Sequence, residues 1–154
     1  MNSPSLISNG NLETEKIGMQ ISKYISNKID SLPFLIFLIG ELGAGKTTLC
    51  RGILEGLGYK GIVKSPTFNI VESYEFLNYL IFHFDFYQIS HQKELSNIGI
   101  QEYLETSNGI SIIEWPEKML SFLPDPDIKV TLKHSKDNAE KRYIEINSKH
   151  NLLV

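Results

Sequence analysis

A glycine-rich loop that carries one lysine follows a short run of apolar residues. The loop is GELGAGKTT, residues 40–48, and the apolar run before it covers residues 35–39. It matches the pattern G-x-x-x-x-G-K-[ST], in which main-chain N–H groups and the start of the next helix cradle phosphate groups. Lys46 offers a positive charge to the β- and γ-phosphates, and the Thr47 hydroxyl suits Mg²⁺, which prefers oxygen ligands. The stretch therefore predicts binding of a nucleoside triphosphate together with Mg²⁺.

Two carboxylates stand at the ends of strand-like runs further along the chain. Asp85 ends LIFHFD, and Glu114 ends ISIIE. If these runs are parallel strands, their carboxyl ends bring both acids beside the phosphate loop. Enzymes with such a loop use acidic groups to hold the metal and to orient the attacking water. We interpret Lys46, Asp85 and Glu114 as the catalytic residues.

The elements that position these residues follow from apolar spacing and from turn residues. Helical spacing covers residues 11–31, 47–57 and, more weakly, 91–107, and Pro33 ends the first helix. Continuous apolar runs at 35–39 and 110–114 predict buried strands. Alternating residues predict two hairpins, formed by 67–76 with 79–87 and by 128–134 with 142–148. Strands mixed with helices indicate an α/β layered domain over residues 11–154, preceded by a loose arm over residues 1–10.

Composition limits the classes of protein that fit. The chain has 154 residues, enough for one domain, and a formal net charge of −3. A protein that holds nucleic acid mainly through phosphates carries a basic surplus, so strong binding of RNA by this chain alone is not expected. No apolar run is long enough for a membrane span, and the start lacks the layout of a secretory signal. The single cysteine, Cys50, fits a reducing cytoplasm.

The nucleotide is predicted to be ATP. Residues 27–30 spell N-K-x-D, the guanine-reading motif of GTPases. In those proteins the motif follows a late strand, whereas here it lies upstream of the phosphate loop and inside the first predicted helix. We therefore set guanine recognition aside.

With these residues identified, the chain resembles the TsaE family, bacterial P-loop ATPases of tRNA threonylcarbamoyladenosine biosynthesis. The resemblance runs from Asn11 to about Ile146 and rests on five motifs in order. These are T-x-x-x-G at 14–18, GELGAGKTTL at 40–49, VKSPTF at 63–68, HFDFY at 83–87 and IIEWPEK at 112–118. It implies a P-loop NTPase fold, a single layered domain with a mixed sheet and helices on both faces.

The resemblance also implies an activity and partners. The protein would be a Mg²⁺-dependent ATPase that hydrolyses ATP slowly and supports a complex of TsaD-like and TsaB-like proteins. That complex makes N6-threonylcarbamoyladenosine next to the tRNA anticodon, and ATP turnover would reset it between rounds. The tRNA would be met only indirectly, through the complex, in the cytoplasm and without a membrane.

Site residues follow from the same resemblance, position by position. Thr47 with Glu114 would hold Mg²⁺, and Asp85 would orient the attacking water or hold metal-bound water; the reverse assignment of the two acids stays open. Residues 11–14 would touch the adenine. The residues expected to contact ATP are Asn11, Leu42, Gly43, Ala44, Gly45, Lys46, Thr47 and Thr48.

One position departs from the family pattern, which continues H-x-D-x-Y with arginine. This chain has Gln88 there, and Lys93, Lys141 or Arg142 are the candidates to supply the missing charge.

Two other functions stay open at this point. A small-molecule kinase needs an arginine-rich lid, which the chain lacks; an interaction module would hold ATP as a structural ligand only.

Overall fold

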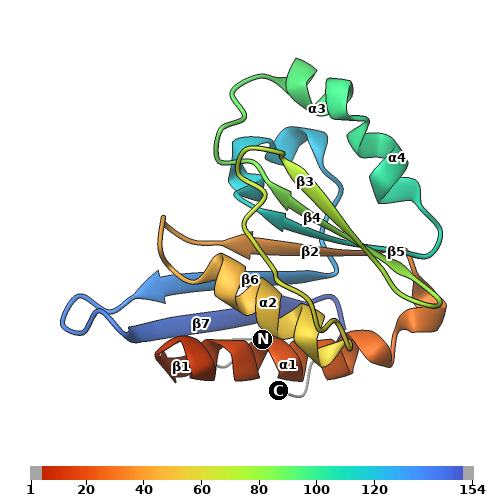
Figure 1. The fold of residues 1–154 in the computed structure, drawn as a ribbon. Helices are drawn as coiled ribbons and strands as arrows, with labels where there is room; N and C mark the ends of the chain where they lie inside the picture. The colour runs from red at the N-terminus through yellow and green to blue at the C-terminus, as the bar shows by residue number, and fades with distance from the viewer. Residues whose placement is uncertain (1–4, 151–154) are drawn as a thin grey trace.

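The computed structural model describes residues 5–150 as one mixed sheet flanked by helices (Figure 1). The sheet has seven strands in the order β1-β7-β6-β2-β5-β4-β3. Their bounds are β1 Ser5–Asn9, β2 Phe34–Ile39, β3 Val71–Glu75, β4 Leu80–Asp85, β5 Gly109–Glu114, β6 Ile128–His134 and β7 Lys141–Ser148. The helices are α1 Asn11–Ser26, α2 Lys46–Gly56, α3 Gln92–Ile98 and α4 Ile100–Glu105, with short 3-10 turns η1 Ile29–Ser31, η2 Pro116–Lys118 and η3 Leu120–Phe122.

The four central strands, β6, β2, β5 and β4, are parallel, and the antiparallel partners β7 and β3 flank them. Strand β2 reads FLIFLI and is apolar at every position, as a strand covered on both faces must be. Because these strands run in one direction, their carboxyl ends meet at one edge. Glu114 lies in register with Leu38 on one side and with Asp85 on the other.

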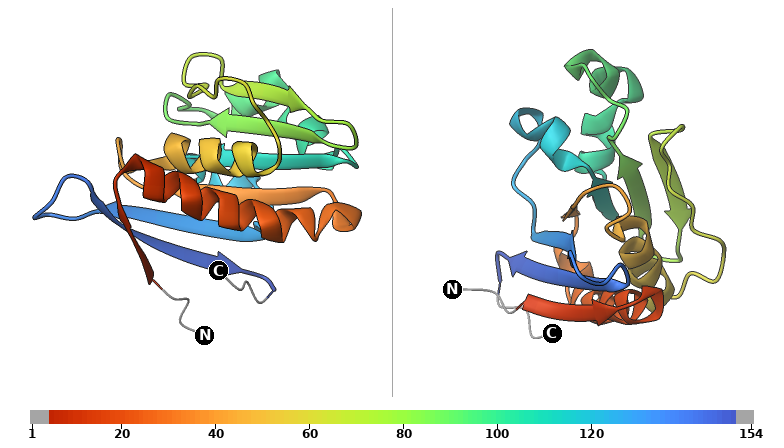
Figure 2. Two further views of the ribbon diagram at one scale, coloured as in Figure 1. Left: turned by 60° about the horizontal axis from the view of Figure 1, so that its bottom comes forward. Right: turned by 90° about the vertical axis from the view of Figure 1, so that its left-hand side faces the viewer.

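Helices cover both faces of the sheet, which confirms the predicted α/β P-loop architecture. Alternate residues of β2 belong to different cores. Ile36 and Leu38 pack with the apolar residues of α1 and α2. Leu35 and Phe37 pack on the opposite face, with Leu95 of α3 and other apolar residues. Figure 2 shows α1 and α2 side by side on their face of the sheet.

Glycines let α1 and α2 approach each other closely. A Cβ atom on Gly18 would lie 2.5 Å from the main-chain oxygen of Leu49. A Cβ atom on Gly52 would overlap the main chain of Glu15. Gly18, the last residue of the T-x-x-x-G motif, therefore serves helix packing, and it fixes α1 against the helix that follows the phosphate loop.

The expectation of a loose arm over residues 1–10 is wrong where the structure describes that segment. Ser5–Asn9 forms strand β1 and pairs antiparallel with β7. Ser8 is fully buried and its hydroxyl lies 2.6 Å from that of Thr14. A short strand with several polar residues gives little periodic signal, which is why the pattern missed it. Residues 1–4 lie outside the described part of the chain.

Other predicted elements are shorter than expected. The first helix ends at Ser26, before the separate turn η1. The first hairpin begins at Val71 because Ile70 has a φ of 67°, a left-handed conformation that a strand does not contain. The predicted helix over residues 91–107 is two helices, divided at Gly99 with a φ of 73°.

Candidate functional site

The loop between β2 and α2 borders a cavity of about 370 Å³ at the carboxyl edge of the sheet. Gly45 precedes α2 and has a φ of 104°, a conformation that favours glycine. The residues that line the cavity come from the loop, from the segment before β3, from the ends of β4 and β5, and from β7. They are Leu42, Gly43, Gly45, Lys46, Thr47, Thr48, Ser65, Thr67, Asp85, Tyr87, Glu114, Trp115 and Arg142.

Lys46 is 5% exposed, and the main chain of its own loop holds its ammonium. The Nζ atom donates to the main-chain oxygen of Gly40 and, at 3.0 Å, to that of Glu41. It also lies 4.0 Å from the centre of the Trp115 ring, a cation–π contact. Burial lowers the pKa of Lys46, while the charges of Glu114, Glu117 and Asp85 act in the opposite direction.

Thr47 and His83 converge on one oxygen of Glu114. The Thr47 hydroxyl donates to Glu114 Oε1 at 2.8 Å, and His83 Nε2 lies 3.1 Å from the same atom. Burial alone opposes protonation of His83, but the neighbouring Cys50 sulfur and the Glu114 carboxylate outweigh it and raise the pKa of His83 to about 10. The sequence analysis gave His83 no role of its own within the HFDFY motif; its place two residues before Asp85 on one strand face was the available signal.

Asp85 is 3% exposed and fixes the segment before β3. Its Oδ2 atom accepts hydrogen bonds from Ser65 Oγ at 2.8 Å and from Thr67 Oγ1 at 2.9 Å. Its Oδ1 atom accepts the main-chain N–H of Tyr87 at 2.8 Å. The S-P-T segment is thereby held beside the phosphate loop, where Ser65 and Thr67 both line the cavity.

Arg142 of β7 lies against the phosphate loop and joins it to the start of α1. Its guanidinium donates to Thr14 Oγ1 and to Asn11 Oδ1, each at 2.9 Å. A Cβ atom on Gly45 would lie 2.8 Å from Arg142 Nη1. Of the three candidates for the missing charge, Arg142 is the one that lines the cavity; Lys93 and Lys141 are not among its lining residues.

The structure brings most of the predicted site residues together. Leu42, Gly43, Gly45, Lys46, Thr47, Thr48, Asp85 and Glu114 all line the cavity. Ala44 does not, because its side chain is 1% exposed and belongs to the core. Asn11 is also absent from the lining, and its side chain is engaged by Arg142.

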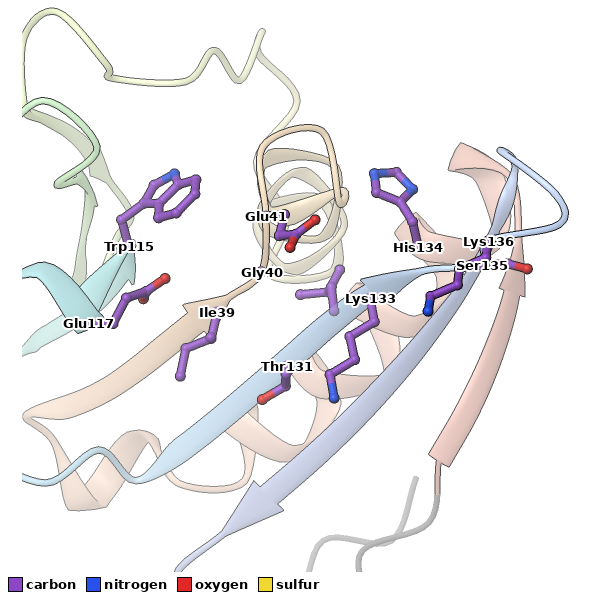
Figure 3. A pocket seen from close by; sticks show the side chains of 11 residues that line it. Ile39, Gly40, Glu41, Trp115, Glu117, Thr131, Lys133, His134, Ser135 and Lys136 are labelled. Carbon is purple, nitrogen blue, oxygen red and sulfur yellow. The ribbon is translucent and has the colours of Figure 1, made fainter.

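A second cavity, of about 560 Å³, lies beside the first and shares Trp115 with it. Figure 3 shows Trp115 and Glu117 on one side of Gly40 and Glu41, and His134 on the other. Lys133 and Thr131 of β6 form its floor, on the sheet face opposite Val130 and Leu132. Trp115 has a φ of 59° and lies between the two hollows as a common wall.

The strand, phosphate-type loop and helix at the centre of this sheet place the chain in the class of proteins with the P-loop NTPase fold. The family model described as "Threonylcarbamoyl adenosine biosynthesis protein TsaE" matches residues 8–144. The chain belongs to that family.

Relatives and a solved structure agree with this assignment. The tRNA threonylcarbamoyladenosine biosynthesis protein TsaE of Haemophilus influenzae is 44% identical over 118 residues, which are 77% of this chain and 72% of the relative. The protein of that name from Rickettsia felis is 31% identical over 97% of this chain and 84% of its own length. The crystal structure of Bacillus subtilis YdiB superposes with a TM-score of 0.73 at 25% identity, covering 97% of this chain and 87% of that one.

No helix within residues 5–150 has the length and apolar character that crossing a membrane requires.

Proposed function

We propose that this chain binds and slowly hydrolyses ATP in the 370 Å³ cavity, as a component of the machinery that makes N6-threonylcarbamoyladenosine next to the tRNA anticodon. Membership of the TsaE family supports the pathway. One observation carries the ATPase: Lys46, Thr47, Asp85 and Glu114, from three separate elements, line a single cavity.

The residues present fit Mg²⁺. Thr47 Oγ1 and Glu114 Oε1 are both oxygen atoms that can act as metal ligands; they lie 2.8 Å apart, and both residues line the same cavity. These are the ligand types that Mg²⁺ prefers, and Mg²⁺ in P-loop proteins is held by few protein ligands plus phosphate oxygens. Thr47 and Glu114 would hold the ion, which when bound neutralises charge on the β- and γ-phosphates.

The residues that line the cavity take separate roles in binding and hydrolysing ATP. The main-chain N–H groups of residues 43–48 bind the phosphate oxygens, aided by the start of α2. Lys46 exchanges the main-chain oxygens of Gly40 and Glu41 for phosphate oxygens. Asp85, held by Ser65 and Thr67, orients the attacking water. Arg142 adds the charge that the family pattern carries at position 88.

The partners follow from the pathway. TsaD-like and TsaB-like proteins would hold the tRNA and carry out the transfer, and ATP turnover here would reset their complex in the cytoplasm. The net charge of −3 agrees with a role in which this chain meets tRNA only through the complex.

The test is the rate of ATP hydrolysis by the purified chain, alone and with its partners. We expect a slow basal rate that requires Mg²⁺, rises with the partners and is lost in Lys46→Ala. The exposed Lys60→Ala serves as the charge-matched control, with an unchanged rate. An unchanged rate in Lys46→Ala would reject the site. Transfer of phosphate to a metabolite would support the kinase function. ATP binding without turnover would support the interaction module.

A further inference from the structure

His83 lies behind the proposed metal site, and none of the steps above uses it. The side chain projects from β4 and is fully buried. Its Nε2 atom lies 3.1 Å from Glu114 Oε1, the oxygen that also accepts the Thr47 hydroxyl. His83 therefore touches a proposed metal ligand without reaching the cavity wall itself.

Glu114 depends on this contact for its orientation. The carboxylate is 2% exposed, and within residues 5–150 its side-chain hydrogen bonds come from Thr47 and His83. Thr47 is itself a proposed ligand of Mg²⁺, so its hydroxyl oxygen has a second task. His83 is then the other neighbour that holds the Glu114 carboxylate, in the way that partners of a ligand set its direction in metal sites.

A structural role explains His83 poorly. Ile81 precedes it on the same strand face, Ile112 of β5 and Glu72 of β3 lie beside it in register, and the Cys50 sulfur is a further neighbour. A buried polar ring costs free energy unless it is hydrogen-bonded. Yet His83 Nδ1 has no hydrogen-bond partner in the described part of the chain. An apolar residue would suit the packing, so the contact with Glu114 is what the ring provides.

We propose that His83 is a positioning residue that holds the Glu114 carboxylate in the orientation needed to bind Mg²⁺. The inference rests on the proposed ATP and Mg²⁺ site. It predicts that removing the ring nitrogen weakens the binding of Mg²⁺ while leaving the metal-free contacts of the protein with nucleotide in place.

The experiment compares His83→Leu, which removes the donor, with His83→Gln, whose amide nitrogen can reach Glu114. Ile81→Val is the matched control, because it trims a buried side chain on the same strand face. Binding of a fluorescent ATP analogue is titrated with Mg²⁺ and repeated in EDTA, and thermal melting verifies folding. We expect His83→Leu to need about 10-fold more Mg²⁺ for half-maximal binding. His83→Gln and Ile81→Val should match the wild type, and binding in EDTA should be equal in all.

Equal Mg²⁺ requirements in His83→Leu and the wild type would overturn the inference while leaving the proposed function intact. Equal impairment of His83→Gln and His83→Leu would also overturn it, since the rescue by an amide would have failed. If His83→Leu does not fold, His83→Asn, whose shorter side chain falls short of Glu114, takes its place against His83→Gln. Absence of any nucleotide binding by the wild type would instead reject the proposed function itself.

Discussion

The Thr47 hydroxyl donates a 2.8 Å hydrogen bond to Glu114 Oε1 across 67 residues of sequence. The first residue belongs to the start of α2 and the second ends β5. Because β2 and β5 are parallel neighbours, their carboxyl ends lie side by side, and the loop that leaves β2 lies close to the end of β5. The pair thus ties the helix that follows the phosphate-type loop to a carboxylate at the end of the neighbouring strand.

Replacement of Arg142 by lysine should weaken ATP binding by about 10-fold, since a charge-assisted hydrogen bond contributes about 1.5–3 kcal/mol. Lysine keeps the charge but cannot hold Thr14 and Asn11 at once as the planar guanidinium does. Isothermal titration with ATP and Mg²⁺ measures the effect. Lys93→Ala and Lys141→Ala are the controls, because neither residue lines the cavity. Equal losses in all three variants would contradict a specific role of the Arg142 guanidinium in ATP binding.

Removal of the Thr67 hydroxyl should loosen the segment before β3. Thr67→Ala leaves Asp85 Oδ2 with Ser65 as its remaining donor. We expect amide hydrogen exchange at residues 67–70 to accelerate severalfold and ATP turnover to fall, since Asp85 would be held less firmly. Exchange measured by mass spectrometry tests this. Asn69→Ala, which removes an exposed contact with Glu72 in the same segment, should leave turnover unchanged. Turnover equal to wild type in Thr67→Ala would show that Asp85 needs no such support.

Replacement of Gly52 by alanine should destabilise the fold by about 1–3 kcal/mol, the usual cost of overpacking. In an open helix the same change is favourable by about 1 kcal/mol. Here the added methyl group would overlap the main chain of Glu15 and push α1 away from α2. The free energy of unfolding in urea measures the change. Glu55→Ala, at an exposed position of α2, should show no such loss. A more stable Gly52→Ala variant would mean that the helices separate without cost.

The free energy of unfolding should decrease as pH rises from 10 to 12, because the pKa of Tyr74 is higher in the folded chain than in the unfolded chain. Burial, with smaller effects from Cys50, Tyr59 and Glu72, raises the pKa of Tyr74 from 10.0 to about 12. Below pH 10 the phenol keeps its proton in both states. Between the two values the unfolded chain loses the proton and the folded chain keeps it, so the free energy of unfolding decreases as pH rises. Tyr74→Phe should flatten this decrease in urea unfolding at a series of pH values. Parallel pH profiles for the two proteins would contradict the shift.

Most of the fold was predictable because its signals are local. The apolar run of β2, the glycine loop and the amphipathic α2 follow one another within residues 34–56, and the order strand, loop, helix identified the architecture. Strand β1 was missed because SLISN carries no clear alternation, and its pairing with β7 depends on residues some 135 positions away. The break at Gly99 was missed for a similar reason, since glycine within a helical pattern does not by itself end a helix.

The site residues, like the fold, fall into those that local sequence predicts and those that only the tertiary structure places. The sequence by itself determined the phosphate loop, Lys46, Thr47 and the two strand-end acids, because amide-lined turns and strand termini are encoded by neighbouring residues. Only the tertiary structure decided that Arg142, and neither Lys93 nor Lys141, lines the cavity, that Asp85 secures Ser65 and Thr67, and that His83 reaches Glu114. These contacts join residues brought together by strand register and by the packing of helices, and no spacing along the chain specifies which side chains will then meet.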